Sequence, residues 1–360
     1  MENMTSIQRV FAALRGELPD RLPIMEAIID KKVRDKICPG ITYNDFIDMM
    51  DLDVVCVEIW SKDFENVKWI NEQKKIFKDK WGATQRLTEE FLPVTTSPAR
   101  INRIEDFNSY VPPDPYKPGL LDEVKDTIKR FKGKKAICFI GEADIAVPEY
   151  LRGGLENLMI DFATNPQLVK KLTKISEEYY IELYRRVIEE GVEIIMLGDD
   201  YAGKNGTFMS PKHFEEYVLP VLERVVVEIK RKGGYVLKHT DGNIWKIIDR
   251  LINTGIDALG PLEPGAGMDY KKIKDIYGSK VCLVGNIDVD LLCRGTDEQI
   301  KRDVKKLIVD VSIRGGHILS SGNTITSAVN PQNYIAMIKT AQSYNLYNLD
   351  KDKLFAEIYG

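Results

Sequence analysis

The stretch KHTDGN, residues 238–243, places a histidine and an aspartate two positions apart, directly after the apolar run GYVL. Side chains two apart on a β-strand point to the same face, so we expect His239 and Asp241 to project together. An imidazole beside a carboxylate can move a proton or supply two ligands to a metal ion. The chain has only three histidines. His239 is the functional candidate, whereas His213, on a predicted helix, and His317, at the start of a predicted strand, are expected to be structural.

Polar side chains also end the other apolar runs of the chain. They are Glu26, Glu58, Glu142 with Asp144, Asp199 with Asp200, Glu263, Asn286 with Asp288, and Ser321 with Asn323. A buried carboxylate is costly unless it is paired or bound to a cation. So many converging acids imply a metal ion, a cationic group or raised pKa values. Asp and Asn also end strands as turn formers and helix caps, and for each residue alone that alternative stays open.

These residues need a fold that brings many strand ends together. Short runs rich in Val, Ile and Leu alternate with amphipathic segments, which is typical of a parallel sheet covered by helices. The runs cover residues 22–28, 53–60, 135–145, 193–200, 234–242, 258–264, 281–289 and 317–323. Eight strand–helix alternations predict an α/β protein of the (β/α)8 TIM-barrel type, and an open doubly wound sheet is the alternative. In such a barrel the carboxyl ends of the strands form the open mouth.

The helices between the runs have recognisable ends. In the segment 210–233, Ser210 is expected to cap the helix and Gly233 to stop it. Thr296 and Gly315 are expected to do the same in the segment 296–315.

We predict a single barrel domain over residues 1–360, with an extra N-terminal helix and an insertion after the second strand. The inserted region, at about 62–118, contains Gly82 within an alternating pattern and ends in the Pro-rich linker VPPDPYKPG. This pattern predicts a hairpin. An insertion at that point of a barrel is expected to lie over the mouth.

Composition narrows the classes of partner. The chain is 44% hydrophobic and 29% charged, and its net charge of −4 gives no electrostatic attraction to nucleic acid or an anionic membrane. No apolar run reaches the ~20 residues of a membrane span, and the N-terminus lacks the apolar core of a signal peptide. We therefore expect a cytoplasmic protein. Its five cysteines form no CxxC pair and are expected to be buried apolar residues.

Five long motifs cover most of the chain. They are IQRVFAALRGELPDRLPI, LGDDYAGKNGTFMSPKHFEEYVLP, HTDGNIWKIIDRLINTGIDALGPLEP, KVCLVGNIDVDLL and GGHILSSGNTITSAVNPQNYIAM. In content and order they resemble the uroporphyrinogen decarboxylase superfamily, and within it the branch of corrinoid-dependent methyltransferases. The resemblance implies a (β/α)8 barrel, in agreement with the strand count, and a tendency to form homodimers.

The chain departs from the superfamily pattern at two places. Decarboxylases carry an arginine-rich segment after the first strand that holds the acidic groups of the porphyrinogen, whereas this chain has EAIIDKKVRDK, with Glu26. Members that methylate a thiol hold zinc with His-x-Cys and a second Cys. Here the matching residues are His239, Asp241 and Asn323. The resemblance therefore implies a more oxygen-rich site for Zn²⁺ or another divalent cation.

Such a site suits the activation of an oxygen rather than a thiol. We therefore expect a methyltransferase that moves a methyl group from an O-methyl compound, above all an aromatic methyl ether, to the cobalt of a corrinoid carried by a partner protein. The expected residues are catalytic His239, Asp241, Asp199, Asp200 and Glu142, substrate-binding Glu26, Trp60, Tyr201, Glu263 and Asn286, and metal-binding His239, Asp241 and Asn323.

Three alternatives stay open at this stage. An enzyme of the same fold could take the methyl group from methanol or a methylamine, or could transfer a methyl group to a thiol. The missing Cys pair weighs against a thiol acceptor. A decarboxylase of the superfamily type is a second enzyme class. A non-catalytic binding protein is the third.

Overall fold

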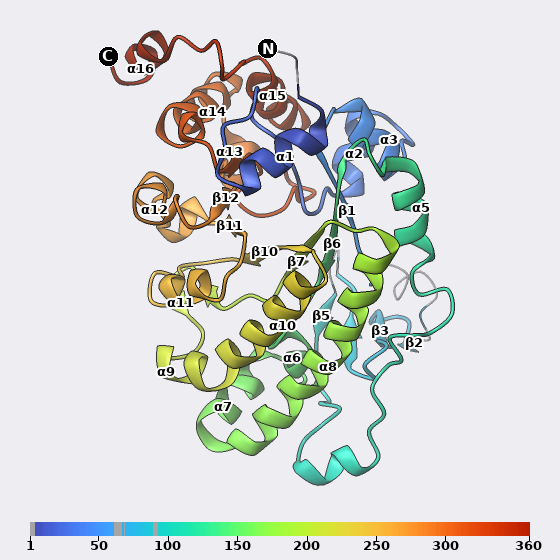
Figure 1. The fold of residues 1–360 in the computed structure, drawn as a ribbon. Coiled ribbons are helices and arrows are strands. Elements are labelled where there is room, and N and C mark those ends of the chain that lie inside the picture. Colours follow the sequence, from blue (N-terminus) through green and yellow to red (C-terminus); the bar gives the residue numbers. More distant parts are fainter. Residues whose placement is uncertain (1–3, 61–66, 68, 89–92) are drawn as a thin grey trace.

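The computed structural model describes residues 4–60, 67, 69–88 and 93–360. Its centre is a curled sheet of seven parallel strands, surrounded by helices (Figure 1). In their order across the sheet the strands are β1 (Val54–Val57), β6 (Ala136–Gly141), β7 (Ile194–Leu197), β10 (Tyr235–Thr240), β11 (Ala258–Pro261), β12 (Cys282–Val284) and β13 (His317–Ile318). The protein is thus an α/β protein, and the sheet is consistent with the predicted TIM barrel.

The first predicted strand, 22–28, is not a regular strand. Ile24 forms an isolated parallel bridge with Leu319, and the N–H of Met25 donates to the carbonyl of Leu319 at 2.9 Å. On the other side, the N–H of Asp53 donates to the carbonyl of Ile24 at 2.9 Å. The segment therefore lies between the two edges of the sheet. Pro23, which has no N–H, cannot contribute a donor to a longer ladder.

Alternate residues of each strand enter two different cores. Cys138 and Ile140 of β6 and Met196 of β7 belong to a buried cluster inside the curled sheet. Phe139 and Leu197 belong to the larger cluster between the sheet and the helices. Helix α1 (Ser6–Leu14), the predicted extra N-terminal helix, contributes Val10, Ala13 and Leu14 to the inner cluster.

The helices form the outer layer (Figure 1). They are α2 (Lys31–Ile37), α3 (Tyr43–Met49), α5 (Asp122–Phe131), α6 (Ala146–Arg152), α7 (Leu155–Thr164), α8 (Pro166–Glu190), α9 (Pro211–His213), α10 (Leu219–Arg231), α11 (Ile248–Asn253), α12 (Tyr270–Tyr277), α13 (Val289–Arg294), α14 (Asp297–Asp310), α15 (Pro331–Gln342) and α16 (Lys351–Tyr359).

The predicted helix ends are largely confirmed. Ser210 accepts a hydrogen bond from the N–H of His213 at 3.1 Å, and a π-helical turn, Phe214–Val218, joins α9 to α10. Thr296 caps α14 in a reciprocal arrangement with Gln299. That helix ends at Asp310, before the predicted Gly315, because a short 3₁₀ turn follows it.

The inserted region contains more than a hairpin. Strands β2 (Trp69–Asn71), β3 (Ile76–Lys78), β4 (Thr84–Arg86) and β5 (Val94–Thr95) form a four-stranded antiparallel sheet. Gly82, in the turn between β3 and β4, has a φ of +72°, which favours glycine. The ring of Trp81 packs on Tyr179 of α8, with ring centroids 4.8 Å apart. The insertion therefore packs against α8 through Trp81, and its predicted place over the mouth stays a prediction.

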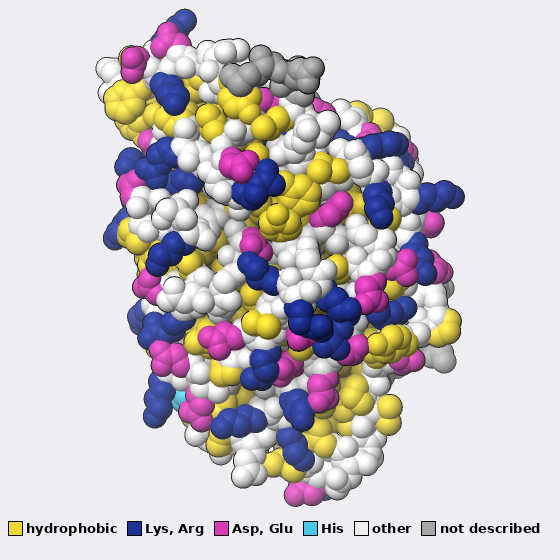
Figure 2. Space-filling model, viewed as in Figure 1, with side chains coloured by type: hydrophobic (Ala, Val, Ile, Leu, Met, Phe, Trp, Pro, Cys, Tyr) yellow, Lys and Arg dark blue, Asp and Glu magenta, His cyan; other side chains and the backbone are white. Residues whose placement is uncertain are grey.

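No helix within the described ranges is long and apolar enough to cross a bilayer. On the face of the molecule in Figure 2, basic and acidic side chains are interspersed rather than gathered by sign. This distribution agrees with the small net charge of the chain.

Candidate active site

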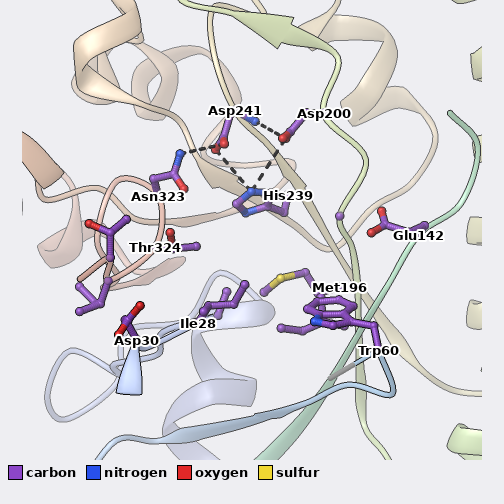
Figure 3. A pocket seen from close by; sticks show the side chains of 15 residues that line it. Ile28, Asp30, Trp60, Glu142, Met196, Asp200, His239, Asp241, Asn323 and Thr324 are labelled. Atoms are coloured by element: carbon purple, nitrogen blue, oxygen red, sulfur yellow. Dashed lines mark hydrogen bonds and ion pairs between the residues drawn. The ribbon is translucent and has the colours of Figure 1, made fainter. Parts of the chain in front are cut away.

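A cavity of about 350 Å³ lies at the carboxyl ends of the strands (Figure 3). Its wall is mixed, with apolar side chains and several acids. The described lining residues are Ala27, Ile28, Asp30, Trp60, Ile140, Glu142, Met196, Gly198, Asp200, His239, Asp241, Asn323, Thr324, Ile325 and Thr326. Six of the residues predicted for the site are therefore brought together here: Trp60, Glu142, Asp200, His239, Asp241 and Asn323.

An imidazole and two carboxylates meet on one wall of this cavity (Figure 3). The Nε2 atom of His239 lies 3.4 Å from Oδ1 of Asp241 and 4.0 Å from Oδ1 of Asp200. The N–H of Asp241 also donates to Oδ1 of Asp200 at 2.8 Å. On β10, His239 lies two residues after the inward-facing Leu237 and therefore also points inward. On β7, Asp200 lies four residues after the inward-facing Met196 and points inward for the same reason. The cluster is thus built from the ends of two neighbouring strands.

The three groups influence one another electrostatically. Desolvation lowers the pKa of His239, but the carboxylates of Asp241 and Asp200 outweigh it, so that the pKa is raised overall. Desolvation and the charge of Asp241 raise the pKa of Asp200 to about 6. Burial alone would raise the pKa of Asp241, but His239 and Asn323 have the larger opposite effect, so that its pKa is lowered overall. The pair His239–Asp241 is therefore arranged to hold a proton at the imidazole.

The turn after His239 requires glycine. Gly242 has a φ of +78°, and a Cβ atom there would lie 2.5 Å from the carbonyl of Ala202. Ala202 begins the short hairpin of β8 (Ala202–Gly203) and β9 (Gly206–Thr207) that follows Asp200. The close approach of the two backbones brings the end of β10 against the end of β7. Asp241 and Asp200 are consequently held at contact distance.

Asn323 contacts the cluster through its amide group. Its Nδ2 donates to Oδ2 of Asp241 at 2.8 Å, so one carboxylate oxygen is held by the amide and the other faces His239. Asn323 comes from the segment after β13, across the mouth from β10. In this arrangement it orients Asp241, and its role as a metal ligand stays a prediction.

Asp199 faces away from the cavity, although it precedes Asp200. Its carboxylate accepts hydrogen bonds from the backbone N–H groups of residues 143–146, at distances from 2.6 to 3.2 Å. These bonds join the end of β7 to the first turn of α6. In the observed geometry Asp199 has a structural role, and its predicted catalytic role remains a prediction.

Glu142 and Trp60 lie on another part of the cavity wall (Figure 3). Burial, followed by repulsion from Asp199, raises the pKa of Glu142 well above its usual value. Both Oε2 of Glu142 and Nε1 of Trp60 are closed to solvent, and neither has a hydrogen-bond partner among the described residues.

Four predicted substrate-binding residues are not among the described residues of the cavity wall. Tyr201 is buried and donates from its hydroxyl to Asp144 at 2.6 Å. Glu263 accepts from the N–H of Gly242 at 3.1 Å and so supports the turn. Asn286 donates to the carbonyl of Leu262 at 2.8 Å. In this geometry the side chains of Tyr201, Glu263 and Asn286 stabilise neighbouring loops.

Glu26, the fourth, is completely buried between the first predicted strand and the end of the last. The hydroxyl of Ser321 donates to it at 2.7 Å and the N–H of Ser321 at 2.9 Å. Burial raises its pKa to about 8, although these bonds work in the opposite direction. Its substrate-binding role also remains a prediction.

Sequence reasoning missed Lys238. This side chain is fully buried on the outer side of β10, and its Nζ donates to the carbonyls of Asp199 at 2.7 Å, His239 at 2.8 Å and Leu197 at 3.2 Å. The ammonium group also lies 4.2 Å from the ring centre of Tyr201. Through these hydrogen bonds Lys238 links the ends of β7 and β10, which carry the cluster. The signal in the sequence was a lysine inside an otherwise apolar run.

The cluster fits a divalent cation. The ligand atoms of Asp200, His239 and Asp241 lie within 4.8 Å of one another. Oδ1 of Asp241 is buried and makes no hydrogen bond to any residue in the described part of the chain. One imidazole nitrogen with carboxylate oxygens is a ligand set that Zn²⁺ and related ions accept. These three residues could therefore hold a metal ion, and Asp200 joins the predicted pair of His239 and Asp241.

The family model of uroporphyrinogen decarboxylase (URO-D) matches residues 78–344 of the chain. The chain belongs to the uroporphyrinogen decarboxylase family. It is 25% identical to the uroporphyrinogen decarboxylase of Trichodesmium erythraeum over 368 aligned positions, which cover 95% of this chain and 97% of that protein. The match to the enzyme of Chlorobium luteolum, at 29% identity, covers 48% of this chain and 47% of that protein.

A solved structure described as a methyltransferase from Methanosarcina mazei has a similar fold. The TM-score is 0.73 at 18% identity, and the superposition covers 95% of this chain and 99% of that chain. The predicted membership of the URO-D superfamily is therefore confirmed, and the protein is an enzyme of this superfamily with a fold shared by a methyltransferase.

Proposed function

We propose that this URO-D family protein is a methyltransferase that takes a methyl group from an O-methyl compound, an aromatic methyl ether above all, and delivers it to the cobalt of a corrinoid held by a partner protein. The observation that carries the proposal is the His239–Asp241–Asp200 cluster on the wall of a small, partly apolar cavity. The fold shared with the methyltransferase of Methanosarcina mazei supports the reaction class.

The cavity suits a small aromatic substrate. Its volume of about 350 Å³ is at the lower end of the range for small-molecule sites. The apolar surface for the aromatic ring of the substrate comes from Ile28, Ile140, Met196 and the indole of Trp60. The ether oxygen would then face the polar wall formed by the cluster.

His239 has the central part in this mechanism. Asn323 orients Asp241, and Asp241 holds the imidazole at 3.4 Å. The raised pKa of His239 keeps a proton at the imidazole, where the oxygen of the leaving phenolate can receive it. A divalent ion held by His239, Asp241 and Asp200 would instead supply Lewis-acid stabilisation of that oxygen. In both cases the residues act on a negative charge that develops as the C–O bond breaks.

Decarboxylation of a tetrapyrrole is a poorer fit to the site. The substrate carries several carboxylates, whereas the cavity wall includes Asp30, Glu142, Asp200 and Asp241. No described residue of the wall is a lysine or arginine. Carboxylates of the substrate would lie close to the acidic side chains of the wall, which is unfavourable in a partly desolvated site.

Metal analysis and methyl transfer to cob(I)alamin test the proposal. Purified protein is assayed for bound Zn²⁺ and then for methylcobalamin formation with a panel of methyl ethers, and with methanol and methylamines. We expect transfer from a methyl ether that the substitution His239→Ala abolishes. His213→Ala is the control, because His213 packs against Phe162 and Tyr217 outside the cavity wall. Transfer that survives His239→Ala, or that occurs only from methanol or methylamines, would contradict the proposal.

A further inference from the structure

Two cysteines lie opposite each other on neighbouring strands of the sheet. Cys56 of β1 and Cys138 of β6 are paired in register in the parallel ladder of these strands (Figure 1). Both belong to the buried cluster inside the curled sheet, so their side chains point to the same face. A hydrogen bond with the Cys56 thiol, followed by burial, raises the pKa of Cys138. The two thiols are therefore in contact.

The spacing of the strands permits a bond between the two sulfur atoms. Neighbouring strands lie about 4.8 Å apart, and the Cα atoms of a disulfide are usually about 4.4–6.8 Å apart. A disulfide also requires Cβ atoms that do not point apart, and residues in register on one face of a sheet meet this condition. Cys56 and Cys138 can thus be joined without a rearrangement of the backbone.

Cys282 shows what distinguishes this pair from an ordinary buried cysteine. It is the third cysteine of the inner cluster, and it lies on β12. Its partner in the ladder on β11 is Ala258 rather than another cysteine. Burial alone agrees with the apolar role expected from the sequence for all three residues. The registered pairing of two thiols is a property of Cys56 and Cys138.

The two members of the pair differ in access. Cys138 has no exposed surface, whereas Cys56 lines a second cavity of about 190 Å³. This cavity adjoins the candidate active site, because Ile28, Trp60 and Ile140 line both. Its wall also has charged and hydroxyl-bearing members, so it can admit a small polar molecule. They are Arg34, Tyr43, Glu58 and Glu123.

We propose that Cys56 and Cys138 are a redox-sensitive thiol pair, which a hydroperoxide converts into a disulfide. In the first step the sulfur of Cys56 attacks the peroxide, which yields a sulfenic acid at Cys56 and releases water or an alcohol. In the second step the sulfur of Cys138 attacks that of Cys56, and the hydroxyl group leaves as water with the proton of Cys138. The peroxide is reduced by two electrons, and the two thiols together are oxidised by two.

The order of the two steps follows from the structure. Cys56 reacts first because the oxidant reaches it through the cavity. Cys138 resolves the sulfenic acid because it is the neighbouring thiol in the ladder. Oxidation thus removes the thiol of Cys56 from the wall of a cavity that adjoins the candidate active site. A dithiol reductant restores both thiols by exchange.

Thiol mapping of the full-length protein tests the pair. The reduced protein is treated with one equivalent of hydrogen peroxide or tert-butyl hydroperoxide, alkylated, and digested without reductant for mass spectrometry. We expect one cross-linked peptide that contains Cys56 and Cys138. The number of free thiols should fall from the five of the chain by two, and dithiothreitol should restore it. Cys38 and Cys293, which are partly exposed, should remain free thiols.

Three substitutions separate the roles of the two thiols. Cys138→Ser should leave Cys56 as a sulfenic acid that dimedone traps, because the resolving thiol is missing. Cys56→Ser should leave Cys138 unmodified, because Cys138 has no exposed surface. Cys282→Ser is the matched control from the same cluster and should form the cross-link as the unchanged protein does. Alanine at position 56 or 138 provides a second version if serine impairs folding.

Three results would overturn the proposal. The first is oxidation of Cys38 or Cys293 while Cys56 and Cys138 remain free thiols. The second is oxidation of Cys56 to a sulfinic acid in the unchanged protein without a cross-link to Cys138. The third is the absence of a dimedone adduct at Cys56 in both Cys138→Ser and Cys138→Ala.

Discussion

Replacing Lys238 by methionine tests whether the site depends on the buried ammonium group. Methionine keeps much of the apolar stem but removes the three hydrogen bonds to the carbonyls of Asp199, His239 and Leu197. Each buried carbonyl left without a donor costs about 1–3 kcal/mol before relaxation. The buried acids Glu142 and Asp144 also lose the positive charge that lowers their pKa values.

We therefore expect Lys238→Met to lower the free energy of unfolding by about 3–5 kcal/mol, the scale seen when one member of a buried charged contact is removed. Because Lys238 joins the strand ends that carry Asp200 and His239, the metal site should also loosen. Loss of such an outer contact typically weakens metal binding ~10–100-fold. Urea denaturation of the metal-free protein measures the first effect, and calorimetric titration with Zn²⁺ measures the second.

Lys274 provides a matched control. It is also buried, and its Nζ donates to the carbonyls of Gly315 at 2.6 Å and Gly316 at 3.3 Å, just before β13 begins. Lys274→Met should destabilise the protein for the same physical reason but leave its affinity for Zn²⁺ unchanged. If the two variants bind Zn²⁺ equally well, or if Lys238→Met is as stable as the unchanged protein, the positioning role of Lys238 is refuted.

Two further predictions concern buried carboxylates. The pKa of Glu26 is about 8 in the folded protein against an ordinary value of 4.5, so the folded chain keeps a proton that the unfolded chain has lost between these two pH values. The free energy of unfolding should therefore fall as pH rises from 4.5 to 8, by on the order of 5 kcal/mol at most. Denaturation of Glu26→Gln should lack this part of the pH dependence, and parallel curves for the two proteins would contradict the assignment. Asp199→Asn should lower the free energy of unfolding by about 1–3 kcal/mol, because an amide cannot accept all the bonds from residues 143–146. A thermal or urea denaturation curve that does not shift would contradict this structural role.

The pattern along the chain was sufficient to predict the strand–helix alternation and the inward direction of His239 and Asp241. Both follow from local rules, since the period of two along a strand does not depend on what the strand packs against. The same rule, counted from Met196, selects Asp200 over Asp199, but only when the inward face of β7 is known. The sequence alone left both aspartates as candidates.

The tertiary structure decided which polar strand ends meet. Asn323 reaches Asp241 because the curled sheet brings the segment after β13 across the mouth from β10. Glu26 ends a predicted strand as His239 does, yet the packing of the first segment against Ser321 buries it completely. The burial of Lys238 likewise depends on carbonyl groups from another strand. Local sequence determines the direction of a side chain from its own backbone, whereas its partners depend on how distant segments pack.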